Sequence, residues 1–485
     1  MTPGEVARHY HELTSYERGR DWTTPVDHPD VLGDFVPMKD ETYPARCKSY
    51  PSDLPVVALP RDWTPVAEPA ASVLAGRRPN LPSQLDLPGL GRILHLSAGV
   101  VRVATVQGRP FLFRAAGSAG GRFPLELYVS ARQVRGLEDG VYWYDPVGHA
   151  LLEVGPPANG ETSALIVTGI PWRTAWKYAE RGLRHVYWDA GTMLSQTLAL
   201  ADSADLGPRL WTRFPDAEVS HLVGADRVHE FPVAVVGLGE GEPAIRPRGG
   251  AVAGTVDVAP VEFPLITRAH HAGDGDHLGS SWPAGAPLVE AVPDSPSLDE
   301  VLLRRGSTRL LVAGAAVPRT TLEWSLAAAL RGVAEVRPDP QFVAVHAVDG
   351  VDPGLYRWPS LDRPLQAGDL RQTLYHVCYD QGLGGDASFV VLSAADLIAG
   401  DDRAYREAQL AAGIVEGRLH IAAFALGAGA SGMTFIDSEL PGLLGEALAG
   451  LIVTCVGVPE YRNRAGGPPG LPTEVKLVAS RMDDR

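Results

Sequence analysis

The stretch Tyr405–Leu426, YREAQLAAGIVEGRLHIAAFAL, is expected to form a long helix, and an earlier stretch of the chain repeats it. Tyr178–Ala199, YAERGLRHVYWDAGTMLSQTLA, aligns with it without gaps and lies in a long helix expected over roughly Ala175–Leu200. The matched positions keep their chemical type: Leu183 falls on Leu410, Asp189 on Glu416, and Leu194 on Ile421. A repeat of this length predicts an internal duplication, in which each copy contributes one long helix.

The neighbouring segments follow the same order in both copies. A helix–turn–helix pattern precedes each long helix, over Val73–Ala98 and Val301–Arg331. Apolar runs typical of strands match in pairs: Ala164–Val167 with Ser388–Leu392, and Val233–Val236 with Leu451–Thr454. We therefore predict an α+β fold of two fused domains that form a pseudo-dimer, with a ligand site in the groove between them. The expected domains are a wrapping arm (1–60), a first half (61–245), a linker (246–295) and a second half (296–485).

Composition limits the classes of protein that fit. The chain has 485 residues, 45% of them hydrophobic, which suits several buried cores. No apolar run is long enough to span a membrane, and the first 20 residues lack the apolar region of a signal peptide. A net charge of −15 argues against nucleic acid as a partner. Three widely spaced cysteines suggest a reducing, cytoplasmic setting.

One short stretch carries unusual positive charge for so acidic a chain. Ser297 with Glu300 is a capping-box pattern that predicts a helix start, and Gly306 is expected to end the helix two turns later. Arg305, Ser307 and Arg309 then follow at the helix end. Taken alone, this stretch favours a solvated face in which Glu300 pairs with Arg304 over an anion site, and the comparison of the two copies reverses this preference.

The two copies differ where a ligand would bind. Opposite Arg305–Arg309 the first copy has Arg78–Pro82, without the hydroxyl or the second guanidinium. Opposite the small-residue turn Ala115–Gly121 the second copy has Glu335–Pro340, which lacks such a turn. The second copy also has two arginines after its last strand, Arg462 and Arg464. Each copy thus has half of a site, so we expect one complete site per chain.

This distribution resembles the FMN-dependent nitroreductase superfamily over most of residues 65–465, and in particular its SagB-type branch. The resemblance implies that each half has a mixed central sheet flanked by helices. The resemblance implies that Arg305, Ser307, Arg309 and one of Arg462 or Arg464 hold the FMN phosphate. A phosphomonoester carries about −1.5 to −2 charges, which this set would balance. The resemblance also implies that further residues cover the flavin ring: Ser118, Ala119 and Gly120 from the turn that continues to Pro124 and Glu126, and Gly429, Ser431 and Gly432 from a glycine-rich loop. In this turn Gly117 and Phe123 replace the usual proline and tyrosine.

The same resemblance implies a catalytic Lys–Tyr pair, Lys177 and Tyr178, where the second copy has Ala404 and Tyr405. SagB-type enzymes oxidise thiazolines and oxazolines in ribosomally made peptides, a reaction that needs a base. Lowering a lysine pKa from about 10.4 to near 7 costs roughly 4 kcal/mol. We expect burial and the arginines at 181 and 184 to supply it. Without the resemblance, Lys177 and Tyr178 would be ordinary interface residues.

The leading hypothesis is an FMN-dependent azoline dehydrogenase that acts on a peptide or small-molecule substrate. It would function as a cytoplasmic, monomeric pseudo-dimer, with a cyclodehydratase as its candidate partner and no nucleic acid or membrane. The first alternative is a general NAD(P)H-dependent nitro or quinone reductase. The second is a non-catalytic flavoprotein scaffold in a peptide-modifying complex.

Two further patterns are not assigned to sites. Gly427–Gly432 fits a dinucleotide-binding pattern but follows an expected helix rather than a strand. A histidine-rich stretch contains His270, His271, Asp274, Asp276 and His277, and we interpret it as a solvated loop rather than a metal site.

Overall fold

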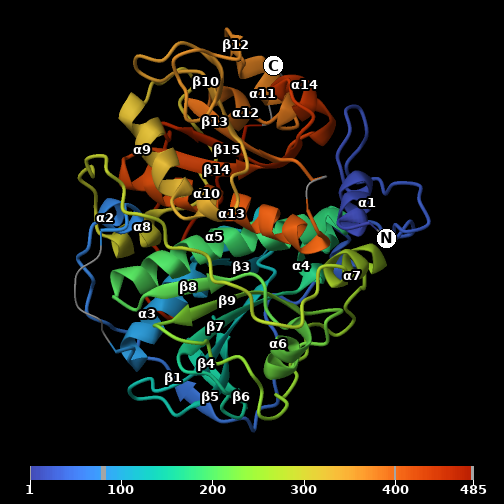
Figure 1. Cartoon of the computed structure of the whole chain (residues 1–485), viewed down its shortest axis with the longest axis vertical. Helices are drawn as coiled ribbons and strands as arrows, with labels where there is room; N and C mark the ends of the chain where they lie inside the picture. The colour runs from blue at the N-terminus through green and yellow to red at the C-terminus, as the bar shows by residue number, and fades with distance from the viewer. Residues whose placement is uncertain (1, 78–83, 107, 398–399, 482–485) are drawn as a thin grey trace.

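The computed structural model describes residues 2–77, 84–106, 108–397 and 400–481. Two open sheets form the two halves, the first in the lower part of Figure 1 and the second in the upper part. The first sheet has the order β1 (Val56–Ala58), β6 (Ala150–Gly155), β5 (Gly140–Asp145), β4 (Leu125–Ala131), β7 (Ser163–Gly169), β9 (Phe231–Leu238) and β8 (Pro208–Trp211). The second has the order β12 (Gln366–Ala367), β11 (Gly354–Arg357), β10 (Gln341–Val345), β13 (Phe389–Ala395), β15 (Ala449–Gly457) and β14 (Gly429–Met433).

Strand order is the same in both sheets once β1 is set aside. The order β6-β5-β4-β7-β9-β8 corresponds position by position to β12-β11-β10-β13-β15-β14. The predicted fold class of two fused α+β domains is therefore confirmed. One detail is corrected, because the described pairs in both sheets are antiparallel and not mixed.

Helices fill the space between the sheets and cover their outer faces (Figure 1). The first half and its flanking segments contain α1 (Glu5–Leu13), α2 (Ala70–Leu74), α3 (Leu87–Ala98), α4 (Pro171–Tyr178), α5 (Gly182–Ser203), α6 (Asp216–Val223) and α7 (Pro264–His271). The second half contains α8 (Leu298–Arg304), α9 (Arg319–Leu330), α10 (Val333–Val336), α11 (Arg371–Val377), α12 (Gly382–Asp386), α13 (Asp402–Ala425) and α14 (Leu440–Leu444). Among the described residues, none of these helices combines the length and the apolar composition that a membrane crossing requires.

The two long helices, α5 and α13, pack against each other across the middle of the molecule (Figure 1). They approach closely at two glycines: a Cβ on Gly191 would lie 2.5 Å from Ile414 N, and one on Gly413 would lie 2.5 Å from Trp188 O. The largest apolar core contains residues of both helices and both halves. The halves therefore share one core.

A second contact joins the halves through backbone hydrogen bonds at the start of α2 and α8. Pro69 and Ser297 form an antiparallel bridge. Ala70 N donates to Pro296 O at 2.9 Å, and Leu298 N donates to Glu68 O at 3.0 Å. These bonds are reciprocal between matching positions, as expected across a pseudo-twofold axis.

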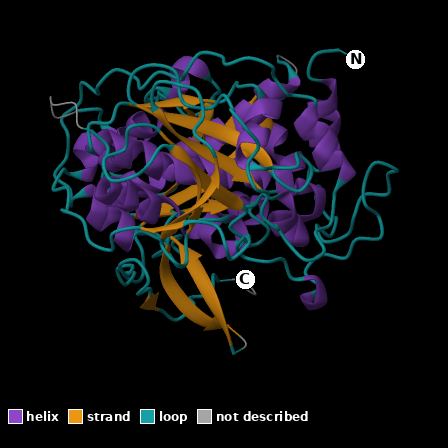
Figure 2. Ribbon diagram, turned by 90° about the horizontal axis from the view of Figure 1, so that it is seen from below, coloured by secondary structure: helices purple, strands orange, loops and turns teal. Residues whose placement is uncertain are grey.

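A small third sheet lies beside the first half. Its strands are β2 (Val100–Val106), β3 (Arg109–Arg114) and the C-terminal β16 (Thr473–Glu474), which pairs with β2 in parallel. Figure 2 shows a strand pair that projects from the body near the C-terminal end. The chain after β15 therefore crosses from the second half to the first.

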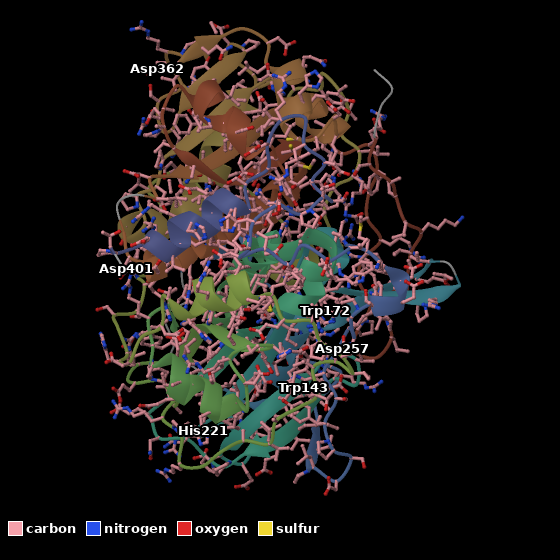
Figure 3. All side chains as sticks on the ribbon, turned by 90° about the vertical axis from the view of Figure 1, so that its right-hand side faces the viewer. Trp143, Trp172, His221, Asp257, Asp362 and Asp401 are labelled. Carbon is pink, nitrogen blue, oxygen red and sulfur yellow. The ribbon has the colours of Figure 1, made fainter. Side chains whose placement is uncertain are left out.

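The N-terminal arm and the linker both pack on the first half. Tyr10 Oη in α1 donates to Glu180 O at 2.6 Å, and Met38 N donates to Trp176 O at 2.8 Å. In the linker, Asp257 accepts a hydrogen bond of 3.1 Å from Trp172 Nε1, a pair labelled in Figure 3. The linker also contains α7, so the expected unstructured connection is instead a partly helical, packed segment.

Candidate active site

Arg305 lies at the junction of the halves because the chain leaves α8 there. Ser297 Oγ caps α8 by accepting from Glu300 N at 3.3 Å, and the exposed Glu300–Arg304 pair forms at 3.2 Å. Arg305 then turns inward to 2% exposure, where its Nε donates to Gln196 Oε1 and its Nη2 to Ala115 O, both at 2.7 Å. Burial lowers its pKa to about 10, so the guanidinium stays charged at neutral pH.

The small-residue turn connects Arg305 to the predicted Lys–Tyr pair. A Cβ on Gly117 would lie 3.8 Å from Arg305 Nη1 and from Ser307 Oγ. Three residues further, Gly120 adopts a φ of 59°, and a Cβ there would lie 3.1 Å from Lys177 Nζ. The turn includes a short 3-10 helix over Ala119–Gly121. It thus lies between Arg305 and Ser307 at one end and Lys177 at the other.

Asp189 of α5 holds this turn in place. Ser118 Oγ donates to Asp189 Oδ2, and Ala119 N donates to Oδ1 at 2.9 Å. Burial, together with the negative charge of Glu416 on α13, raises the pKa of Asp189 to about 7. The sequence comparison paired Asp189 with Glu416, and in the structure these carboxylates are electrostatic neighbours.

Lys177 and Tyr178 end helix α4. Burial lowers the pKa of Lys177, and the charges of Arg122 and Arg309 lower it further. Tyr178 stacks on His185 with ring centroids 3.9 Å apart, and burial raises its pKa. The surroundings therefore disfavour the protonated amine of Lys177 and the ionised hydroxyl of Tyr178.

The continuous helix expected over Ala175–Leu200 is wrong. The chain breaks at Ala179, whose φ of 46° and ψ of −140° are non-helical, and a 3-10 turn over Ala179–Arg181 separates α4 from α5. As a result, Arg181 and Arg184 do not share a helical face with Lys177. Both pair instead with the buried Asp437, at 2.6 Å and 2.7 Å.

Arg122 and Arg309 provide the positive charge near Lys177 that was expected from Arg181 and Arg184. Arg122 follows the turn directly, donates from Nε to Arg173 O at 2.9 Å and lies over the Trp176 ring at 4.3 Å. Sequence reasoning missed Arg122, although its place next to the turn was a usable signal. Asp189 was noticed only as a repeat position.

The segment Gly429–Gly432 is the edge strand β14 and not a loop. Thr308 N donates to Ala430 O at 2.9 Å, so the strand lies directly beside the Arg305–Arg309 stretch. A Cβ on Gly432 would lie 2.7 Å from Glu416 Oε1. The glycines therefore allow neighbouring side chains to approach the backbone.

Three buried polar atoms of this region have no hydrogen-bond partner within the described part of the chain: Arg305 Nη1, Thr308 Oγ1 and Ser431 Oγ. An unpaired buried polar group is costly, so such a cluster is typical of a site that a ligand completes. Its donors fit an anionic group.

The C-terminal arginines lie on the segment that packs over this stretch. Tyr461 Oη accepts from Arg309 N at 3.1 Å. Both Arg462 and Arg464 are exposed, and Arg464 Nη1 donates to Glu474 O at 2.8 Å. A residue that the sequence did not suggest, Arg102, joins them: its Nε donates to Arg464 O at 2.9 Å, and its charge acts on Arg305. The first-copy stretch Arg78–Pro82, used in the comparison of copies, lies outside the described residues.

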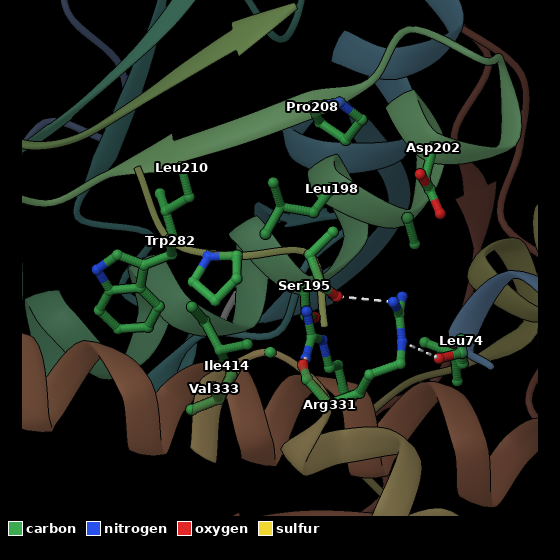
Figure 4. A pocket seen from close by; sticks show the side chains of 15 residues that line it. Leu74, Ser195, Leu198, Asp202, Pro208, Leu210, Trp282, Arg331, Val333 and Ile414 are labelled. Carbon is green, nitrogen blue, oxygen red and sulfur yellow. Dashed lines mark hydrogen bonds between the residues drawn. The ribbon is translucent and has the colours of Figure 1, made fainter. Parts of the chain in front are cut away.

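A separate pocket lies between α5 and α13 near the linker (Figure 4). Ser195, Trp282 and Arg418 help to line it, and none of the predicted site residues does. Arg331 donates from Nε to Leu74 O at 2.8 Å and from Nη1 to Ala284 O at 2.7 Å. Its guanidinium thus binds backbone carbonyls of α2 and the linker.

The histidine-rich stretch is partly helical rather than a loop. His270 and Asp274 lie near Asp216, close enough to share a cation. Arg403 pairs with Asp216 at 2.6 Å, and Arg406 pairs with Asp274 at 3.1 Å. These carboxylates therefore already form ion pairs with guanidinium groups.

Comparisons with known proteins support the same fold. No protein-family model matches the chain. A protein named as a nitroreductase, MJ1384 of Methanocaldococcus jannaschii, is 29% identical over 172 residues, which are 32% of this chain and 82% of that protein. The trifolitoxin-processing protein TfxF of Rhizobium leguminosarum bv. trifolii is 28% identical over 150 residues, 31% of this chain and 54% of that protein.

A solved structure extends the likeness to both halves. A crystal structure named for a nitroreductase from Anabaena variabilis superposes with a TM-score of 0.71 at 24% identity, over 94% of this chain and 99% of that chain. Since the match covers both chains almost completely, the two-domain arrangement occurs in that protein as well. This chain therefore has the nitroreductase fold over nearly its whole length, and the predicted resemblance to the nitroreductase superfamily is confirmed.

Proposed function

We propose that this protein is an FMN-dependent dehydrogenase that converts azolines in a peptide to azoles. The observation that carries the proposal is the position of Lys177. This lysine, whose pKa is lowered, lies at one end of the Gly117–Gly120 turn, and Arg305 and Ser307 lie at the other. A base and an anion site at opposite ends of one turn suit a cofactor with a phosphate and a reactive ring.

The residues present fit FMN. Arg305 Nη1 and Thr308 Oγ1 are buried and have no hydrogen-bond partner among the residues that the structure describes, and the exposed Arg309 lies nearby to add charge. We expect Arg305, Ser307 and Arg309 to hold the phosphate, because charge-assisted hydrogen bonds are worth roughly 1.5–3 kcal/mol each. Ser118–Gly120 would lie along the ring. FMN, when bound, accepts a hydride, and O₂ or another acceptor then takes its electrons.

Lys177 and Tyr178 would handle the proton and the orientation of the substrate. Aromatising an azoline removes a proton from the α-carbon and a hydride from the β-carbon. The neutral amine of Lys177 would take the proton, and the lowered pKa favours that form relative to an ordinary lysine. Tyr178 keeps its proton because burial raises its pKa, so its hydroxyl donates a hydrogen bond to the substrate.

The relative TfxF supports a peptide as the substrate, since its name describes the processing of trifolitoxin. A peptide azoline must first be made by cyclodehydration, so we expect a cyclodehydratase as the partner. The fused halves suit a monomeric pseudo-dimer, because the shared core already supplies the interface that a dimer would form.

The decisive test is Lys177→Ala with a thiazoline peptide. We expect FMN content to be unchanged and azole formation to fall by about 100-fold or more, as on removal of a general base. Lys476→Ala, at an exposed position, is the matched control and should keep full activity. Turnover by Lys177→Ala at the wild-type rate would exclude Lys177 as the base.

A second candidate function follows from the relative MJ1384, which is named as a nitroreductase. A reductase would use NAD(P)H to reduce nitroaromatics or quinones. Anaerobic spectra separate the two: bleaching of bound flavin by NADPH favours the reductase, and bleaching by a thiazoline peptide favours the dehydrogenase.

A further inference from the structure

Residues 13–26, a part of the N-terminal arm, are held by hydrogen bonds beside the candidate catalytic pair, Lys177 and Tyr178. Arg181 Nη1 donates to Thr14 O at 2.8 Å, and Arg184 Nη2 donates to Thr14 Oγ1 at 2.8 Å. Tyr16 N donates to Asp437 Oδ2 at 2.8 Å. The buried arginines just after Tyr178 therefore position a defined segment of chain.

This arm reaches Tyr178 itself. The Trp22 ring lies 6.1 Å from the Tyr178 ring and 6.3 Å from the Tyr16 ring, centroid to centroid. Trp22 is only partly buried. An indole that contacts a candidate catalytic tyrosine and keeps a solvent-facing side is well placed to contact a substrate.

A pocket lies between the arm and the segment Tyr178–Arg181, and polar and apolar side chains both line it. The arm contributes hydroxyl and guanidinium groups: Thr14, Ser15, Tyr16, Arg20, Thr23 and Thr24. Tyr16 Oη and the Nε and Nη2 atoms of Arg181 are buried and have no hydrogen-bond partner among the described residues. These unpaired groups are all donors, so the pocket suits a ligand with acceptor oxygens.

We propose that this pocket binds the peptide main chain next to the reacting ring, with its carbonyl oxygens facing the Tyr16, Arg20 and Arg181 donors and its side chains against Trp22. This inference rests on the proposed function, and it makes residues 13–26 a specificity element. The arm would then select substrates by their flanking residues, while Lys177 on the other side of Tyr178 acts on the ring.

The test compares Trp22→Ala and Arg20→Ala with Arg18→Ala. Arg18 lies on the same arm, but its side chain forms only an exposed contact of 3.6 Å with Glu439. We expect KM for a thiazoline peptide to rise about tenfold in Trp22→Ala and Arg20→Ala, as when an interface anchor is truncated. Their kcat and FMN content, and all constants of Arg18→Ala, should stay near wild type. A thiazoline amide that lacks flanking residues should be processed equally by all four proteins.

A binding measurement separates failure of the pocket from failure of the proposed function. The dissociation constant of the product, a thiazole peptide, is measured by calorimetry on each FMN-loaded protein. If wild type turns over the substrate, and KM and product affinity are unchanged in Trp22→Ala and Arg20→Ala, the proposal that the pocket binds the peptide is wrong. The proposed function then still holds. Weaker product binding in both variants supports the pocket even if wild type oxidises no azoline. No binding and no turnover by wild type overturns both.

Discussion

Lys177 shows how a residue's chemistry depends on neighbours that are distant in sequence. Its pKa is lowered by burial first and then by Arg122, 55 positions earlier, and Arg309, from the other half. The arginines that follow it in sequence, at 181 and 184, have no such role because Asp437 pairs with both. Local spacing along an assumed helix could not reveal this, since the helix ends at Tyr178.

Replacing Arg122 with glutamine should raise the pKa of Lys177. The base works in its deprotonated form, so activity is present above this pKa and is lost as the pH falls through it. Removing a nearby positive charge moves that loss to higher pH, by roughly one unit. The measurement is the pH profile of kcat/KM for a thiazoline peptide. Arg135→Gln, which removes an exposed arginine paired with Asp86, is the control. An unshifted acidic limb in Arg122→Gln would contradict the assignment.

At the scale of elements, the sequence predicted those helices and strands that hydrophobic periodicity or the internal repeat indicates. The helices α3, α8 and α13 and the strands β7, β9, β13 and β15 were expected close to where they lie. The break at Ala179 was not, because a positive φ at an alanine has no local signal and is imposed by packing. The strand β14 was expected to be a loop because the family resemblance implied a glycine-rich loop there, whereas pairing with β15 decides its conformation.

The turn between Gly117 and Gly120 is the element on which the candidate site depends. Gly120→Ala should destabilise the protein by about 1–2 kcal/mol through its left-handed φ. The added Cβ would also lie 2.8 Å from Tyr178 Oη, so azole formation should fall as the Lys–Tyr pair shifts. Thermal unfolding and turnover measure the two effects. Gly314→Ala has a φ of 77° and open space around it, so it should show the strain alone. Full activity in Gly120→Ala would show that the turn does not position the pair.

At the scale of the whole molecule, the halves depend on each other through α5 and α13. Their core is continuous, so we expect a single cooperative unfolding transition. The domain boundaries predicted at 60, 245 and 295 stay predictions, and so does the duplication as an event in the history of the chain. What the sequence could not supply is the path of the connecting segments, which pack on the first half through side chains without periodic spacing.

Gly413→Ala tests this interdependence. A Cβ at Gly413 would lie 2.5 Å from Trp188 O, so overpacking should cost about 1–3 kcal/mol. Calorimetry should show one transition at a lower temperature, with both halves affected together. Gly442→Ala, in α14 with no atom within 4 Å of the new Cβ, should leave the transition unchanged or slightly higher. Separate transitions for the two halves would contradict a common core.

The matching strand order of the two sheets has a consequence for how such a protein can change. In a homodimer each substitution occurs in both subunits. A substitution that improves one site must therefore also be tolerated at the equivalent position of the other subunit. Here the positions around Lys177 and those around Arg305 occur once each, on different halves of one chain. Mutational libraries restricted to residues 115–189 can therefore vary the surroundings of the base while residues 305–309 are held constant. Residues of the two halves can therefore be substituted independently within one chain.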